Sequence, residues 1–181
     1  MRTVTALLLA VFLISGQLLA QTDLLNARVD KLEIRNSDDG LTVSYKVSGS
    51  FTRDIIEKIQ SGIETTFEHV IKIYKKIPVF PASRTVVEKI IVTSVRYDTL
   101  TKQYSLSRRV DDLIVETSVT DKLEDVEKWM SEISDFKIGT IDAIRGKRNY
   151  FLKVRTSLAP NFLLFFIPYD YSASKEKELK F

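Results

Sequence analysis

Apolar and polar residues alternate along residues 63–74, and this alternation constrains the fold more than any other feature of the sequence. If the stretch is extended, Ile63, Phe67 and Ile71 share one face with His69, while most of the charged residues take the other. A period of two is the pattern of a β-strand with one buried face. The stretch therefore predicts a long strand that packs one side against a core.

The same kind of pattern recurs along most of the chain. Residues 85–97 differ in being β-branched and apolar on both faces, which predicts a central strand covered on both sides. The connections between the predicted strands are short, and short connections favour antiparallel pairing. Strands are predicted at residues 29–36, 41–48, 63–74, 85–97, 103–109, 113–119 and 150–158.

Two other segments have the apolar spacing of amphipathic helices. The first begins after Thr52, which suits an N-cap, and ends at Gly62. The second begins at Asp121, with Glu124 in the capping-box position, and is expected to bury Trp129. We therefore expect a mainly β, α+β fold, with about seven or eight antiparallel strands in a sandwich-like or strongly curved sheet and two helices packed on it.

The N-terminus has the layout of a secretory signal peptide. Arg2 precedes an uncharged apolar run at residues 6–14, and Ala20 provides a small residue for cleavage. The alternative is a retained membrane anchor, but the run is shorter than the roughly 20 apolar residues that span a bilayer. We expect an exported protein, periplasmic or extracellular, that is cleaved near Ala20.

The rest of the chain contains no Pro/Gly/Ser-rich linker and no repeat, so its composition gives no sign of a boundary between domains. The expected organisation is one domain with short extensions. Its boundaries are a signal peptide at 1–20, a short lead at 21–28, a single β-rich domain at 29–168 and a polar, extended tail at 169–181.

The composition also narrows the chemistry that this chain can perform. It has no cysteine, which excludes thiol catalysis and Cys-ligated metals. Its one histidine, His69, is expected to be a hydrogen-bonded residue of the core or sheet rim rather than a catalytic base. A net charge of +3 does not indicate nucleic-acid binding. We assign no catalytic, cofactor-binding or metal-binding residue.

The most unusual segment is an apolar run between Pro160 and Pro168. The first interpretation is a buried strand, because a strand covered on both faces has this composition. The second is an exposed patch that contacts a partner protein or the membrane surface. The residues of the run are Phe162, Leu163, Leu164, Phe165, Phe166 and Ile167.

A second distinctive motif is the turn at residues 97–104. Tyr97 and Tyr104 flank it and can pair across the ladder. Asp98 can accept backbone N–H bonds within the turn, and Leu100 can fold back over the two rings. We interpret the motif as turn architecture, with a binding role as the alternative.

On these motifs the chain resembles the domain of unknown function 4390 family of exported bacterial proteins. The resemblance is carried most specifically by the Tyr-Asp-x-Leu-Thr-Lys-x-Tyr turn, and it extends over most of residues 29–168. It implies no particular activity, cofactor or catalytic residue. Genes of the family often neighbour that of a membrane sensor kinase, which implies an envelope role. The other matching segments are residues 61–63 with Phe67, 71–74, 123–126 and 133–138.

The sequence therefore favours a non-enzymatic binding domain of the bacterial envelope, with an envelope or membrane protein as its partner. The alternative is a small exported hydrolase or carbohydrate-active enzyme built on carboxylates, which leave little trace in a sequence. A deep pocket with two converging acidic side chains would favour the enzyme. The sequence does not indicate an oligomeric state.

Overall fold

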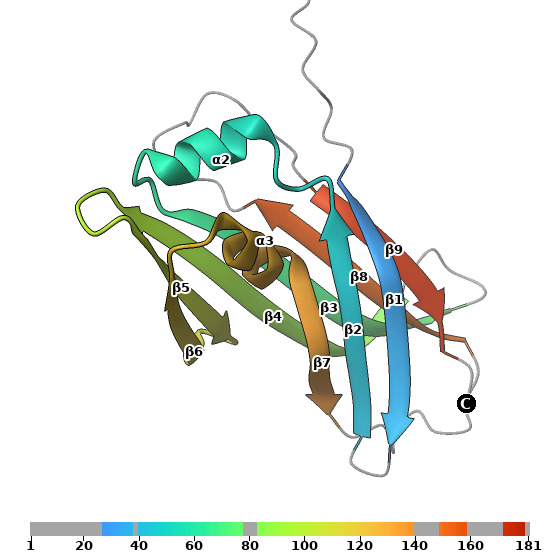
Figure 1. The fold of residues 1–181 in the computed structure, drawn as a ribbon. Helices are drawn as coiled ribbons and strands as arrows, with labels where there is room; N and C mark the ends of the chain where they lie inside the picture. Colours follow the sequence, from blue (N-terminus) through green and yellow to red (C-terminus); the bar gives the residue numbers. More distant parts are fainter. Residues whose placement is uncertain (1–26, 38–39, 78–82, 140–148, 159–171, 180–181) are drawn as a thin grey trace, which may run out of the picture.

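The computed structural model shows two antiparallel sheets, and one face of the larger sheet is covered by the smaller sheet and two helices (Figure 1). The mainly β, sandwich-like α+β fold expected from the sequence is confirmed, and the sheets do not close into a barrel. The structure describes residues 27–37, 40–77, 83–139, 149–158 and 172–179.

The smaller sheet has three strands and the larger has six. In spatial order the smaller sheet contains β1 (Arg28–Ser37), β2 (Gly40–Ser48) and β7 (Glu132–Gly139). The larger contains β6 (Leu113–Thr120), β5 (Gln103–Val110), β4 (Ser83–Asp98), β3 (Thr65–Lys76), β8 (Tyr150–Leu158) and β9 (Ser172–Glu178). The helices are α2 (Arg53–Gln60) and α3 (Leu123–Ser131).

Strand β3 lies at the centre of the larger sheet and confirms the predicted alternation from Thr65 onward. Ile63 was expected on the buried face, but it precedes the strand and is exposed. The odd-numbered side chains of β3, from Phe67 to Ile73, are buried against the layer above. Toward one end, Ile71 packs in a core between the two sheets. Toward the other, Phe67 packs in a second core beneath the helices, with Ile59 of α2 and Met130 of α3. The helices thus complete the layer where the smaller sheet ends.

Strand β4 was expected to be covered on both sides, and this prediction is wrong. Ile91 and Val95 are fully buried on the inner face, but Val86 and Ile90 are exposed. The reason is that no second layer among the described elements packs on the outer face of the larger sheet. The β-branched composition of β4 reflects strand propensity rather than burial on both faces.

The sequence did not predict strands β7 and β9, because each forms by pairing with a strand that is distant in the sequence. The second predicted helix ends at Ser131, and β7 follows at once, with Ile133 and Ile138 in the core between the sheets. The polar tail contains β9, which pairs with β8 and buries Ala173. The predicted strand at 113–119 exists as β6, but it is exposed from Leu113 to Val119.

The helix caps differ in detail from the prediction. Thr52 occupies the N-cap of α2, but its hydroxyl makes no capping bond. Asp121 is not the cap of α3, because Lys122 holds that position. Thr120 instead accepts the N–H of Lys122 and donates to Asp125 at 2.7 Å. These contacts tie the end of β6 to the first turn of α3.

The tyrosine-flanked turn is largely as predicted. Tyr97 and Tyr104 are directly opposite, with ring centroids 4.6 Å apart. Asp98 accepts the N–H groups of Thr101 and Leu100, and these bonds lower its pKa. Leu100 does not cover the rings, since 91% of it is exposed at the tip of the turn. In the structure the motif thus forms a turn between β4 and β5.

Two expectations lie outside the described residues: the apolar run at 162–167 and the signal peptide at 1–20. No helix in the described part of the chain is long and apolar enough to span a membrane.

A buried polar cluster around His69 joins the layers. The Nδ1 atom of His69 lies 2.9 Å from the Thr156 hydroxyl, and Nε2 lies 3.1 Å from the Met130 carbonyl oxygen and 3.3 Å from the Thr93 hydroxyl. A carbonyl can only accept, so the proton is on Nε2, and Nδ1 accepts from Thr156. His69 is thus the hydrogen-bonded core residue that the sequence predicted.

The pKa of His69 determines how stability depends on pH. Burial lowers this pKa from 6.5 to about 3. As pH falls through 6.5, the unfolded chain takes up a proton that the folded protein does not. The stability that His69 contributes is therefore complete above pH 6.5 and is lost as pH falls toward 3, by roughly 1.4 kcal/mol per pH unit.

We expect urea unfolding between pH 7 and pH 4 to show this loss. His69→Gln cannot be protonated and should give a flatter profile, whatever its own stability, because the chain has no other histidine. The carboxylates contribute equally to both proteins, so the difference between the two slopes reports His69 alone. Parallel profiles would contradict the neutral, buried imidazole.

Candidate functional site

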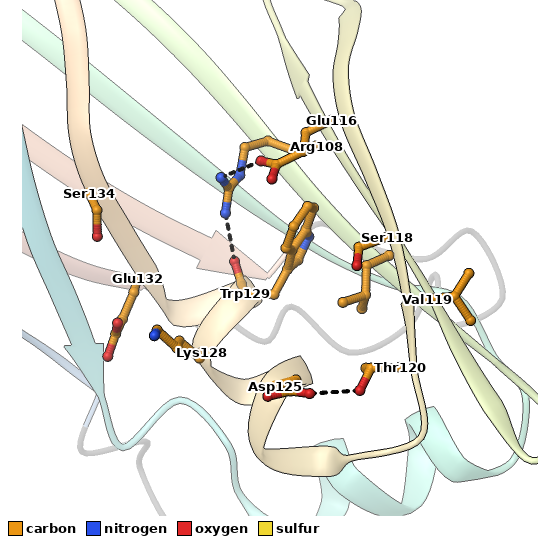
Figure 2. Close-up of a pocket in the computed structure, with 11 residues that line it drawn as sticks. Arg108, Glu116, Ser118, Val119, Thr120, Asp125, Lys128, Trp129, Glu132 and Ser134 are labelled. Atoms are coloured by element: carbon orange, nitrogen blue, oxygen red, sulfur yellow. Dashed lines mark hydrogen bonds and ion pairs between the residues drawn. The ribbon is translucent and has the colours of Figure 1, made fainter.

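A groove of about 360 Å³ lies between α3 and the edge of the larger sheet. Strands β5 and β6 form one wall, and α3 with the start of β7 forms the other (Figure 2). The side chains that matter here are Arg108, Glu116 and Ser118 from the sheet, Asp125, Lys128 and Trp129 from α3, and Glu132 from β7.

The indole of Trp129 forms a side of this groove. The sequence predicted that Trp129 would be largely buried, but it is only half-buried. The reason is that α3 turns Val126 and Met130 into the core, which leaves Trp129 on the flank of the helix. The indole Nε1–H donates to the Ser107 carbonyl at 3.4 Å, so the ring is held against β5.

Arg108 covers the ring of Trp129 and has an unusual position for a charged residue. It lies on the inner face of β5, opposite Thr93 on one side and Glu116 on the other. Its guanidinium carbon is 4.4 Å from the Trp129 ring centroid. It donates to Glu116 at 2.9 Å and to the Trp129 carbonyl at 3.3 Å. Its buried Nε–H has no partner among the described residues.

Arg108 and His69 together satisfy the C-terminal end of α3. The last carbonyls of a helix have no partner within the helix. The Trp129 carbonyl accepts from Arg108, and the Met130 carbonyl accepts from His69. The Arg108 charge also suits the negative end of the helix dipole. Both contacts fix how α3 lies on the sheet, and hence the shape of the groove.

The carboxylates of the groove do not converge on one point. Figure 2 shows Glu116, Asp125 and Glu132 on three different sides of it. Each has a neighbour of its own: Glu116 pairs with Arg108, Asp125 accepts from Thr120, and Glu132 pairs with Lys46 at 2.9 Å. In the described part of the chain, no three acidic or histidine residues gather as metal ligands.

A second hollow, of about 560 Å³, includes the outer face of β4, β5 and β6. Hydroxyl side chains from these strands line it, including Ser94, Ser107 and Thr117. These three residues are directly opposite one another along the sheet. The hollow lies on the face of the sheet that no other layer covers, and its floor carries neither an aromatic ring nor a buried charge.

The sequence did not identify the groove. The tyrosine-flanked turn is absent from its lining, and the apolar run at 162–167 lies outside the described residues. One signal was available: Arg108 has the same parity as the buried residues Tyr104 and Leu106. A charged residue on the buried face of a predicted strand indicates a partner or a functional position.

The stacked pair can be tested with the fluorescence of Trp129, the only tryptophan in the chain. Arg108→Ala removes the guanidinium from the ring, so we expect a red-shifted emission maximum and stronger acrylamide quenching. We also expect a stability loss of about 1–3 kcal/mol, because charge-assisted hydrogen bonds are lost. The control Glu116→Gln keeps Arg108 on the ring and should leave the emission unchanged. Identical spectra for all three proteins would contradict the stacked geometry.

Comparisons with known proteins identify the family. Comparisons with curated proteins and with solved structures gave no match. Residues 25–163 match the family described as "Domain of unknown function (DUF4390)", which is well over half of the chain and includes both helices and strands β1 to β8. The resemblance stated from the tyrosine-flanked turn is thereby confirmed, and the chain belongs to the DUF4390 family.

Proposed function

We propose that this protein is an exported envelope protein that acts as a non-enzymatic binding domain. Its ligand is a segment of another envelope protein, and the groove between α3 and β6 is where that segment binds. The observation that carries this proposal is the stacked pair of Arg108 and Trp129 on the wall of the groove.

Tryptophan and arginine are among the residues most enriched in the energetic centres of protein interfaces. Trp129 is half-buried, so a ligand that covers the rest of the indole would gain apolar burial. Arg108 holds the ring in place, because its guanidinium carbon lies 4.4 Å from the centroid of the indole. A rigid aromatic surface beside a fixed charge is suited to holding a peptide segment.

The rest of the groove indicates the chemistry of that segment. Lys128 is exposed on α3 and makes no ion pair with any described residue, so its ammonium group can pair with an acidic side chain of the ligand. Ser118 and Ser134 add hydroxyl groups to the lining. We infer a segment with an apolar side chain against Trp129 and an acidic one toward Lys128.

The alternative expected from the sequence, a carboxylate-based hydrolase, lacks a comparable observation. Glycoside hydrolysis needs two carboxyl groups that flank one bond, roughly 5–10 Å apart. In this groove the carboxylates lie on three sides and contact separate neighbours.

Export is part of the proposal and is supported by the layout of residues 1–20. N-terminal sequencing of protein from its native host should begin at or near Gln21. Full-length protein that begins at Met1 in the membrane fraction would contradict cleavage.

The binding role can be tested with a photo-reactive amino acid at position 128, in the groove, and at position 153 as a control. Both positions are exposed lysines, but Lys153 lies on β8, outside the groove. In intact cells we expect one defined envelope protein to cross-link from position 128 and not from position 153. Trp129→Ala in the same background should abolish that adduct.

Three results would contradict the proposal: the same adducts from both positions, adducts that persist in Trp129→Ala, or no protein adduct from position 128. Liposome flotation of the purified protein tests the remaining alternative, in which the ligand is the membrane surface. Binding to anionic vesicles that is unaffected by Trp129→Ala would assign the membrane surface as the ligand through another part of the molecule.

A further inference from the structure

Strand β6 ends the larger sheet and leaves one side without a partner among the described strands, where it pairs only with β5 (Figure 1). An unpaired strand edge carries free N–H and C=O groups that can pair with another chain. On β6 this edge is also apolar. Its exposed apolar residues are Leu113 (72% exposed), Ile114 (68%), Val115 (57%) and Val119 (60%).

The other three sheet edges have features that discourage pairing. Strand β1 has a bulge at residues 30–33, where Lys31 takes a positive φ of 47°. Strand β7 has irregular register and an exposed Asp135, also at φ 47°. Strand β9 is rich in charged residues and lies beside β1 (Figure 1). Of the four edges formed by the described strands, only β6 combines backbone groups that lack a described partner with an apolar surface.

Charge does not protect β6 either. Glu116 is its only charged residue, and it pairs with Arg108 of the same chain. The ladder with β5 is regular from Glu116 to Thr120. The register with β5 shifts between Ile114 and Glu116, so the regular part of the edge is residues 116–120, and its one charge is paired with Arg108.

We propose that the β6 edge pairs antiparallel with the β6 edge of a second copy of this chain, about a twofold axis at Thr117. Residues directly opposite in an antiparallel pair point to the same face of the sheet. A twofold axis between two residues would pair side chains that point to different faces, so the axis must pass through a residue. An axis at Thr117 puts Glu116 opposite Ser118 and Val115 opposite Val119. This register packs Val115 of each copy against Val119 of the other, while Ile114 lies opposite Thr120 and Leu113 lies beside the end of the paired segment.

The neighbouring registers are less favourable. An axis at Glu116 would place the two Glu116 carboxylates directly opposite each other, and like charges in that position are destabilising. An axis at Ser118 would place Val119 opposite Thr117 and so separate Val115 from Val119. Of these three registers, only the axis at Thr117 places Val115 opposite Val119 without placing the two carboxylates opposite each other.

The pairing would bring two grooves together. Ser118 and Glu116 line the groove on the inner face of β6, and both lie within one residue of the proposed axis. The two grooves would then meet across the axis as one longer channel. The dimer does not depend on the groove being a binding site, because only the β6 strand edge is needed to form it.

The first test is a single cysteine at the axis, which is unambiguous because the chain has none. Opposite Cα atoms in an antiparallel pair are about 4.5–5.5 Å apart, within the range for a disulfide. Thr117→Cys should therefore form a covalent dimer under mild oxidation. Ser105→Cys is the matched control, since it is exposed on the same face of β5 but would be at least about 14 Å from its equivalent.

The second test is the mass of the protein in solution, measured by sedimentation equilibrium. We expect a dimer for the wild type and for the control Val86→Lys on β4. Val119→Lys should be a monomer with an unchanged circular dichroism spectrum, because Val119 is exposed within each copy.

A wild-type monomer at every soluble concentration would overturn the proposal. So would a Ser105→Cys cross-link as efficient as that of Thr117→Cys. A monomer in which a photo-reactive group at position 119 captures a different protein would assign the edge to a partner's strand instead. The proposed function fails separately, through the adducts at position 128.

Discussion

The neutral imidazole of His69 is the interaction on which the rest of this structure depends. It bonds to Thr156 of β8, to Thr93 of β4 and to the end of α3 through Met130, and its ring lies 6.0 Å from that of Tyr45 in β2. It therefore meets both sheets and a helix at the point where the two apolar cores join. A buried polar group that loses its partner costs about 1–3 kcal/mol, so these contacts restrict how the layers can pack.

The same contacts shape the groove. Because His69 and Arg108 hold the last carbonyls of α3, the helix cannot rotate on the sheet without losing both bonds. Trp129 is thereby kept on the flank of the helix, half-buried and stacked. The cluster is not fully satisfied, since the Tyr45 hydroxyl is buried without a hydrogen-bond partner among the described residues. Burial raises the pKa of Tyr45, and the Thr156 side chain offsets part of that rise.

Much of this fold could be predicted from the sequence, because alternation and turn chemistry are local. The hairpin of β1 and β2, the long strand β3 and the turn at residues 97–104 follow from side-chain period and from Asp and Gly preferences. Strands β7 and β9 could not be predicted, because their burial depends on pairing with distant partners. Trp129 and the apolar residues of β6 are more exposed than their spacing in the sequence suggests, since periodicity identifies a face but not what covers it. The groove depends on Arg108, Glu116 and Trp129 meeting in space, and their spacing in the sequence carries no sign of that.

A neutral His69, protonated on Nε2, fixes the end of α3 on the sheet. The most direct measurement is a long-range ¹H–¹⁵N NMR correlation of the imidazole, which is unambiguous because the chain has one histidine. At pH 7 we expect the pattern of the Nε2–H tautomer, unchanged down to the pH at which the protein unfolds. A proton on Nδ1, or a ring that titrates near its ordinary pKa of 6.5 in the folded protein, would contradict this assignment.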